Sequence, residues 1–389
     1  MNNIIKNAVK KTTDWVLYSG IQNTEGGLSK IGGFNSWFDT EKKNYRYIYS
    51  EITGYGLTTL AYLYSKSSNP LFKERAVLAG DWVLNNALHE TGGVYTRYYL
   101  ENDREENKYS FDSGMLYAFD AGMVLFGIAR LYEITGEKRF LKAAVKIGDF
   151  LTDKCQKEDG SIFAVYDSKK GELISNNEKW STQSGSFHAK AAMGLYSLYE
   201  ITMDKKYLAA ALKLCDRSLA FQKESGRFVS FSDIGATHLH PHSYSCEGLM
   251  YIGIKLKNKD YIASAAKGII WALDNALKKN HLHYLYIGGR FNEYERVDAL
   301  SQIFRLASYS LQKGYIEDFY QQKLDYLTEN ILSYQHVKDE QSGGFFYGFS
   351  DMGEKLPHIN SWCSMFALQA LDFYNDLLND KKISIDYLV

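Results

Sequence analysis

The sequence of 389 residues is poor in the features that separate domains, with three prolines, no Ser/Pro/Gly-rich stretch and no block of like charges. Linkers between domains usually carry such segments, so nothing marks an internal boundary. With 45% hydrophobic residues, the chain can bury a large core. We therefore expect one domain over residues 1–389.

An excess of either charge is also missing, because 45 Lys and Arg residues nearly balance 46 Asp and Glu residues. Binding to nucleic acid or to an anionic membrane surface usually needs a basic patch, so neither partner is expected. No run of eighteen apolar residues occurs, and the N-terminus lacks the apolar segment of a signal peptide. These absences predict a cytoplasmic protein without a transmembrane segment, and they leave its oligomeric state open.

The cysteines are few and do not indicate a metal site or disulfide bonds. The four residues Cys155, Cys215, Cys246 and Cys363 lie far apart and form no CxxC pair. Neither a zinc site nor a disulfide framework is therefore indicated, and we expect small, buried thiols. No cofactor is predicted.

Aromatic residues are abundant, with 31 Tyr, 21 Phe and 6 Trp. Aromatic rings pack on the C–H faces of sugars, while the polar atoms of Tyr and Trp can hydrogen-bond to hydroxyl groups. The composition suits a sugar-binding cleft, although a core rich in tyrosine explains it equally well.

An internal repeat is the strongest signal in the chain. Residues 119–162 read as a helix, a short turn, a second helix and a polar Gly-containing loop, and residues 186–228 repeat this order. Within them, "LYEITGEKRFLKAA" and "LYEITMDKKYLAAA" align position by position. Weaker copies begin near Gly54, Glu247 and Asp298. The repeat predicts a series of helical hairpins.

The first helix of each hairpin is apolar on most faces, and the second is amphipathic. A helix that is apolar all round is buried, which predicts an inner and an outer ring of helices. The last helix, "NSWCSMFALQALDFYNDLL", lacks a partner, as does an outer-type helix at about residues 3–19. Pairing these two closes a ring of six hairpins. The inner helices are expected to begin near Glu51, Asp120, His188, Glu247, Asp298 and Asn360.

Six hairpins with "TGGVY", "EDGSI" and "SGGFFYG" at the turns between them resemble the (α/α)6 toroid of the six-hairpin glycosidase-like superfamily. The stretch "GLYSLYEITMDKKYLAAALKLCD" is similar to the repeat unit of unsaturated glucuronyl and rhamnogalacturonyl hydrolases. The resemblance implies an all-α (α/α)6 toroid. Toroids of this kind include glycoside hydrolases, polysaccharide lyases and the N-acylglucosamine 2-epimerase family.

In such a ring, the loops that enter the inner helices share one face. Carboxylates stand at these helix starts, namely Glu51, Asp120, Glu247 and Asp298, with Asp112 in a preceding loop. Glycoside hydrolysis needs one protonated and one ionised carboxyl group, which such residues could supply. An alternative role is to complement the helix dipole. Resemblance to unsaturated glucuronyl hydrolases nominates Asp112 or Asp120, although "KWSTQSGSFHAK" replaces their Trp-Arg-Gly signature.

The stretch "ATHLHPHSYSCEG" places His238, His240 and His242 on alternate positions. We expect Pro241 to keep this segment extended, with a helix from about Ser243. The spacing differs from the helical i, i+4 pair of zinc peptidases, so metal binding is not predicted. Packing or capping and proton transfer or sugar binding remain as alternatives.

This stretch is also similar to the "THLH" signature of the N-acylglucosamine 2-epimerase and cellobiose 2-epimerase family. That resemblance implies proton exchange at C2 of an opened sugar by two histidines, here His240 and His358 of "PHINSW". The early arginine motif of the family does not occur in "YRYIYSEITGYG".

Further substrate-binding candidates lie on the same loops and helix starts. They are Trp37, Tyr55, Trp180, His188, His238, Tyr244, Asn360 and Trp362. Arg97, Arg290 and Arg296 could each bind a substrate carboxylate with two hydrogen bonds, although ordinary salt bridges explain them equally well.

Together these features favour a glycoside hydrolase that uses paired carboxylates on an oligo- or polysaccharide, with or without uronate residues. The alternatives are a sugar 2-epimerase that uses His240 and His358, a polysaccharide lyase, and a glycan-biosynthesis accessory protein without catalysis.

Overall fold

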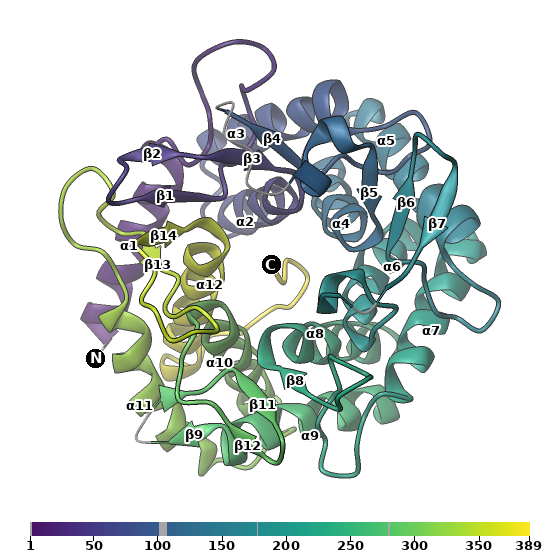
Figure 1. Ribbon diagram of the computed structural model, residues 1–389. Coiled ribbons are helices and arrows are strands. Elements are labelled where there is room, and N and C mark those ends of the chain that lie inside the picture. Colours follow the sequence, from purple (N-terminus) through teal and green to yellow (C-terminus); the bar gives the residue numbers. More distant parts are fainter. Residues whose placement is uncertain (1, 101–106, 177, 279–280) are drawn as a thin grey trace. The chain divides into compact units, whose positions relative to one another are not determined.

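The computed structural model describes residues 2–100, 107–176, 178–278 and 281–389. These residues form twelve α-helices joined by loops with short strands (Figure 1). They divide into two compact units, which are described separately. The first unit comprises the chain up to Ile21, Trp37–Asn44 and Phe221–Leu388, and the second comprises Gln22–Ser36, Tyr45–Ala220 and Val389. One domain over residues 1–389 stays a prediction.

The second unit consists of three helical hairpins, as the repeat predicts. Inner helix α4 packs between inner helices α2 and α6, and each inner helix packs against the outer helix that follows it. The helices are α2 (Ser50–Ser67), α3 (Pro70–Trp82), α4 (Ala118–Thr135), α5 (Lys138–Asp149), α6 (Ala191–Thr202) and α7 (Lys205–Leu219).

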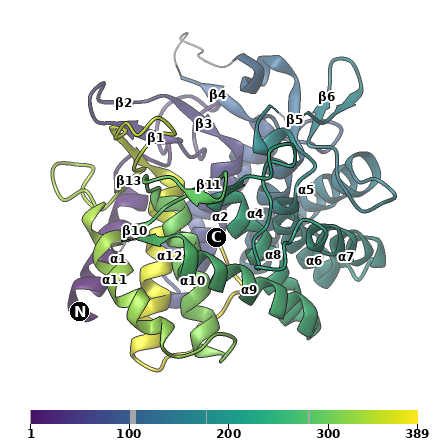
Figure 2. The ribbon, with the colours of Figure 1, turned by 60° about the horizontal axis from the view of Figure 1, so that its bottom comes forward.

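The first unit holds the remaining helices. They are α1 (Asn2–Tyr18), α8 (Leu239–Leu256), α9 (Lys259–Asn275), α10 (Val297–Gln312), α11 (Tyr320–Ser333) and α12 (Ser361–Leu378). Inner helix α10 contacts both α8 and α12, and the outer helices α9 and α11 pack on α8 and α10. Helix α1 packs against α12 (Figure 2), so the N-terminal helix completes the last hairpin as predicted.

Burial separates inner from outer helices as the sequence pattern predicts. Every residue of α4 from Ala118 to Leu131 is buried. The outer helix α5 buries only one face, which consists of Phe140, Ala143, Ala144, Ile147 and Gly148. Hydrophobic burial on all sides therefore holds the inner helices in place, whereas the outer helices keep a polar face for water.

In the glycine turns between hairpins, the main chain packs closely against the main chain of an outer helix. Gly92 has φ +94°, and a Cβ atom there would lie 2.1 Å from the carbonyl oxygen of Lys146. Gly343 has φ +105°, with the carbonyl oxygen of Lys11 2.2 Å from such an atom. No side chain fits at either position, which explains why "TGGVY" and "SGGFFYG" recur where an outer helix gives way to the next inner helix.

Short strands lead directly into several inner helices and fix the positions of the residues at their N-termini. In the second unit, β3 (Tyr47–Tyr49) pairs with β4 (Arg97–Tyr99), and Tyr49 lies opposite Arg97. In the first unit, β1 (Trp37–Asp39) pairs with β14 (His358–Asn360), and Trp37 lies opposite Asn360. The sheet register therefore brings residues from distant loops to the helix starts.

The other strands are β2 (Asn44–Tyr45), β5 (Met115–Tyr117), β6 (Val165–Asp167), β7 (Glu172–Ile174), β8 (Thr237–His238), β9 (Leu277–Lys278), β10 (His281–Leu282), β11 (Leu285–Ile287), β12 (Arg290–Phe291) and β13 (Phe345–Phe346). Short helical turns are η1 (Val83–Ala87), η2 (Asn107–Tyr109), η3 (Phe111–Ser113), η4 (Phe150–Cys155), η5 (Trp180–Thr182) and η6 (Ser186–Lys190).

Two helix starts differ from the sequence prediction. Helix α8 begins at Leu239, not at about Ser243 or near Glu247, so Pro241 lies in its first turn and Glu247 lies in its third turn. Proline is tolerated there because the amide groups of the first turn have no partner within the helix. His188 lies in the 3-10 turn η6, and the α-helix that follows begins only at Ala191.

All four cysteines are buried and free, as expected. Within the described ranges, no helix is both long and apolar enough to cross a membrane.

Candidate active site

A pair of buried carboxylates marks the helix starts of the second unit. Glu51 lies in the first turn of α2 and Asp120 in the first turn of α4, and these two helices pack together. Glu51 is 9% exposed and Asp120 is 4% exposed. Burial raises the pKa of Asp120 well above its usual value, and the negative charge of Glu51 raises it further. Burial raises the pKa of Glu51 as well. Such a pair retains a proton at a pH where isolated carboxyl groups have lost theirs.

Arg97 supplies positive charge beside this pair. Burial disfavours its charged form, but Tyr47 and Tyr49 raise the pKa of Arg97 above its usual value, so the guanidinium stays charged. It lies 4.7 Å from the ring centre of Tyr47 and 4.4 Å from that of Tyr109. Its charge lowers the pKa of both carboxyl groups, but burial outweighs this effect.

The remaining candidates of the second unit surround these helix starts. Tyr55, buried in α2, hydrogen-bonds to Glu51. Trp180 lies in η5, with its ring 6.1 Å from that of Phe119. The Nε2 atom of His188 lies 3.1 Å from the carbonyl oxygen of Gln183, and burial lowers the pKa of His188 to about 4. This imidazole is therefore neutral at pH 7.

Asp112 lies elsewhere. It is exposed in the turn η3, and its main-chain oxygen accepts a hydrogen bond from Lys169. The structure thus places Asp120, and not Asp112, in the buried carboxylate pair.

In the first unit, Asp298 and Arg296 form a buried ion pair at the start of α10. Arg296 donates two hydrogen bonds to this carboxylate, one of them from Nε at 3.2 Å. The indole nitrogen of Trp362 donates a further bond at 3.1 Å. Burial raises the pKa of Asp298, but the charge of Arg296 outweighs it and lowers the pKa below its usual range. Asp298 is therefore an ionised carboxylate and a poor proton donor.

His240 connects this ion pair to Glu247 through Gln302. The amide nitrogen of Gln302 lies 3.3 Å from a carboxylate oxygen of Glu247, and its amide oxygen lies 2.7 Å from Nδ1 of His240. Since a carboxylate only accepts, this amide orientation is fixed, and Nδ1 of His240 must carry the proton. Burial lowers the pKa of His240 to about 4. The neutral ring thus keeps a lone pair on Nε2, as a general base requires.

Glu247 is held deeper in the helices of the first unit. It is fully buried and accepts hydrogen bonds from Arg305, one of them from Nε at 3.2 Å. Arg305, also fully buried, donates to Gln369 on α12 at 3.2 Å. These contacts hold Glu247 as an ion-pair partner between α8, α10 and α12.

The three histidines have three different environments. The Nε2 atom of His238 lies 2.8 Å from a guanidinium nitrogen of Arg296. His240 lies in the network with Gln302, and its ring is 4.4 Å from that of the buried Tyr244. His242 contacts main-chain atoms through both ring nitrogens, with Nδ1 accepting from the Phe228 amide and Nε2 near the Gly268 carbonyl. His242 therefore has a packing role, and His240 is the candidate for proton transfer.

Trp362, whose indole nitrogen donates to Asp298, belongs to a cluster of aromatic rings. Trp37 stacks on His358 with ring centres 4.7 Å apart, and it meets Trp362 edge-on at 6.4 Å. Asn360 caps α12 by accepting a hydrogen bond from the amide of Cys363. The register of β1 with β14 brings Trp37, His358 and Trp362 together.

Arg290 lies apart from these residues, exposed on β12. Among the described residues, no group of three or more His, Cys, Asp or Glu side chains could hold a metal ion.

Gln302 and Arg305 are members of this network that sequence reasoning missed. Both are fully buried on α10, where they follow Asp298 by four and seven residues. Residues with this spacing share one face of a helix. The sequence pattern that could have revealed them is the row of polar residues Asp298, Gln302 and Arg305 on one face of an otherwise apolar inner helix.

Comparison with known proteins supports the fold. A family model of glycosyl hydrolase family 76 matches residues 115–234, which include Asp120. No curated protein sequence matches the chain.

Solved structures match over nearly the whole chain. A sugar epimerase from a ruminal bacterium is 13% identical, with 97% of this chain and 100% of that chain covered and a TM-score of 0.76. Cellobiose 2-epimerase from Bacillus thermoamylovorans is 12% identical, with 94% and 99% covered and a TM-score of 0.74. An unsaturated glucuronyl hydrolase specific for heparin is 13% identical, with 97% and 99% covered and a TM-score of 0.71.

The chain therefore has the (α/α)6 toroid fold, and its resemblance to the six-hairpin glycosidase-like superfamily is confirmed. At this level of identity the structures establish the fold alone, so the activity has to be inferred from the residues.

Proposed function

We propose that this protein is a carbohydrate-active enzyme that hydrolyses glycosidic bonds with Asp120 and Glu51. The observation that carries the proposal is the burial of both carboxyl groups at neighbouring helix starts, where the pKa of each is raised. Glycoside hydrolysis needs one protonated and one ionised carboxyl group. Burial and the charge of Glu51 favour the protonated form of Asp120, which leaves Glu51 as the ionised group. The match to a glycosyl hydrolase family over the segment that contains Asp120 supports the same reaction class.

In the proposed reaction, protonated Asp120 donates its proton to the glycosidic oxygen as the bond to the anomeric carbon breaks. Ionised Glu51 accepts a proton from the water molecule whose oxygen bonds to that carbon. Arg97 would stabilise the charge of Glu51, and its guanidinium could also face a uronate carboxylate. The direct test is to incubate the protein with neutral and uronate-containing oligosaccharides and to measure newly formed reducing ends. Hydrolysis predicts such ends from at least one substrate, and their absence from every substrate would count against it.

Two substitutions should move the pKa of Asp120 in opposite directions. Glu51→Gln removes a negative charge, so the pKa of Asp120 should fall. Arg97→Met removes a positive charge, so it should rise. The carboxyl signal of Asp120 in 13C NMR, assigned by its loss in Asp120→Asn, reports this titration without depending on turnover. Unchanged titration in both variants would show that the three groups do not interact.

A second candidate function, sugar epimerisation or isomerisation, is favoured by the environment of His240 in the first unit. Gln302 fixes the proton on the Nδ1 atom of His240, so Nε2 carries the lone pair of the neutral ring, and the ionised Asp298 lies 3.5 Å from Nδ1. A base of this kind could remove a proton next to a carbonyl carbon of an opened sugar and return it. The structural similarity to epimerases is consistent with this reaction.

Replacing His240 and His242 separately tests this candidate. His240→Ala should abolish any exchange of the C2 proton of a reducing sugar, whereas His242→Ala should leave it unchanged. His242→Ala should instead lower the free energy of unfolding by about 1–3 kcal/mol, because its main-chain partners lose their hydrogen bonds. Proton exchange followed by NMR and urea denaturation check the two effects. Wild-type exchange in His240→Ala would remove His240 from the reaction.

A further inference from the structure

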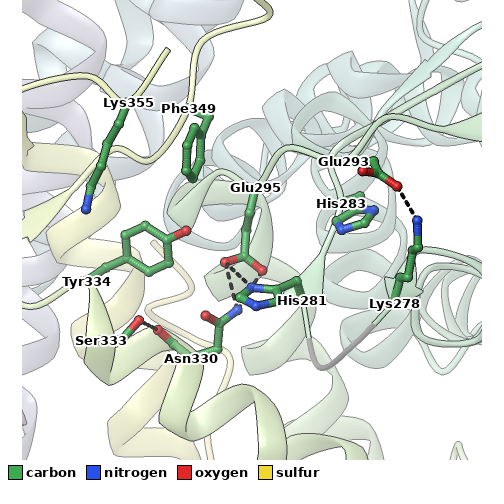
Figure 3. A pocket seen from close by; sticks show the side chains of 10 residues that line it. All are labelled: Lys278, His281, His283, Glu293, Glu295, Asn330, Ser333, Tyr334, Phe349 and Lys355. Atoms are coloured by element: carbon green, nitrogen blue, oxygen red, sulfur yellow. Dashed lines mark hydrogen bonds and ion pairs between the residues drawn. The ribbon is translucent and has the colours of Figure 1, made fainter. Parts of the chain in front are cut away.

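A cavity of about 410 Å³ lies in the first unit beside the C-terminal end of α11 (Figure 3). Its walls come from the strands β9 and β10, the end of α11 and the loops before α10 and after β13. The lining residues are Lys278, His281, His283, Glu293, Glu295, Asn330, Ser333, Tyr334, Phe349 and Lys355. The volume lies within the range of small-molecule binding sites.

Glu295 forms the floor of this cavity and is 2% exposed. The amide nitrogen of Asn330 donates to its carboxylate at 2.6 Å (Figure 3). The main-chain amide of Leu282 donates to the same carboxylate at 2.7 Å. The Nδ1 atom of His281, whose side chain is exposed, lies 3.5 Å from a carboxylate oxygen of Glu295. Burial raises the pKa of Glu295, so its carboxyl group lies where ionisation is costly. A ligand hydroxyl that donates to this group would reduce that cost.

With both glutamates ionised, the charges of the Lys and Glu residues in the lining cancel. Lys278 and Lys355 balance Glu293 and Glu295, and Lys278 is paired with Glu293. Burial lowers the pKa of His283, which therefore stays neutral at pH 7. The two carboxylates would repel a ligand with a net negative charge, and the two lysines would repel a ligand with a net positive charge. The lining thus suits a neutral ligand that both donates and accepts hydrogen bonds.

Aromatic surface is also present. Phe349 is half-buried at the edge of the cavity and is backed by Tyr294, with ring centres 6.2 Å apart. Tyr334 lies on the same side, with its hydroxyl group directed toward Glu295 (Figure 3). A supported aromatic face beside carboxylate, amide and imidazole groups matches the mixed surface of a sugar ring.

We propose that this cavity is a second carbohydrate site, which binds a neutral hexose unit outside the candidate active site. The cavity and the Arg296–Asp298 ion pair use neighbouring residues of the chain, because Glu295 lines the cavity and the next residue, Arg296, pairs with Asp298. The choice of a sugar as ligand rests on the proposed carbohydrate function, whereas the preference for a neutral ligand rests on the lining residues.

Saturation-transfer NMR with defined probes tests this proposal. The probes are the methyl glycosides of glucose, galactose and mannose, with glucuronate and glucosamine as anionic and cationic counterparts. Ser333→Trp places a large ring at the exposed mouth of the cavity. Gln322→Trp, also exposed on α11 but outside the cavity, is the matched control. We expect a neutral methyl glycoside to bind to the wild type and to Gln322→Trp, and to bind at least about tenfold more weakly to Ser333→Trp.

The proposal fails if no neutral glycoside binds, if Ser333→Trp binds as well as the control, or if glucuronate or glucosamine binds better than every neutral probe. Binding is measured in parallel with Asp120→Asn and His240→Ala, which should both retain it. The failure of the reducing-end assay with retained binding would refute hydrolysis alone, whereas cleavage without this binding would refute the second site alone.

Discussion

Asp120→Asn is expected to lower the rate of glycoside hydrolysis by about 10²–10⁴-fold, because the asparagine amide keeps the shape of the side chain but cannot donate the catalytic proton. The substitution also removes a carboxyl group that burial and the charge of Glu51 keep from ionising easily. The melting temperature should therefore stay the same or rise. Initial rates of reducing-end formation and thermal unfolding of the same preparation measure the two effects.

Asp112→Asn is the matched control, since Asp112 precedes the same helix but is exposed in η3. It should retain the wild-type rate. A loss of activity in Asp112→Asn with normal activity in Asp120→Asn would transfer the role of proton donor to the loop and contradict the buried pair.

Arg305→Met should cause the largest loss of stability, about 3–5 kcal/mol, because it leaves the carboxylate of Glu247 buried without its cation. Both side chains of this ion pair are fully buried, so water cannot replace the lost guanidinium. Urea denaturation of the wild type and the variant measures the difference in the free energy of unfolding.

The double variant Glu247→Gln/Arg305→Met tests the cause of this loss. It removes the buried charge and keeps an acceptor for the Gln302 amide, so most of the stability should return. If Arg305→Met alone costs less than about 1 kcal/mol, the pair is no stronger than a surface salt bridge.

The fold could be predicted from the sequence because the buried face of each helix appears as a periodic pattern of apolar residues. The inner helix α4 is apolar all round and the outer helix α5 on one face only, and the same pattern recurs in each hairpin. The unpaired helices at the two ends predicted the contact between α1 and α12, which the structure shows. The pattern of apolar residues was therefore enough to predict both the helices and the pairing of the two terminal helices.

The start of α8 could not be predicted in the same way. Pro241 is compatible with an extended segment and with the first turn of a helix, and only packing decides between them. The helical turn separates His240 from His242, which alternation along a strand would have placed together. A local pattern with two allowed geometries thus gave the wrong start for this helix.

The sequence also could not show which residues of the candidate site contact each other. Glu51 and Asp120, like His240 and Gln302, come from different hairpins, more than sixty residues apart. Carboxylates at helix starts were visible as candidates, but pKa values depend on which of them are buried together. Because hydrolases and epimerases share this fold, these local environments have to decide the reaction.

The most direct test is to incubate the protein with neutral and uronate-containing oligosaccharides in heavy water and to analyse the products by mass spectrometry. Hydrolysis by Asp120 and Glu51 predicts shortened glycans with new reducing ends and no carbon-bound deuterium. Uncleaved reducing sugars that carry deuterium at C2 would contradict this account and would identify the reaction as proton exchange by His240.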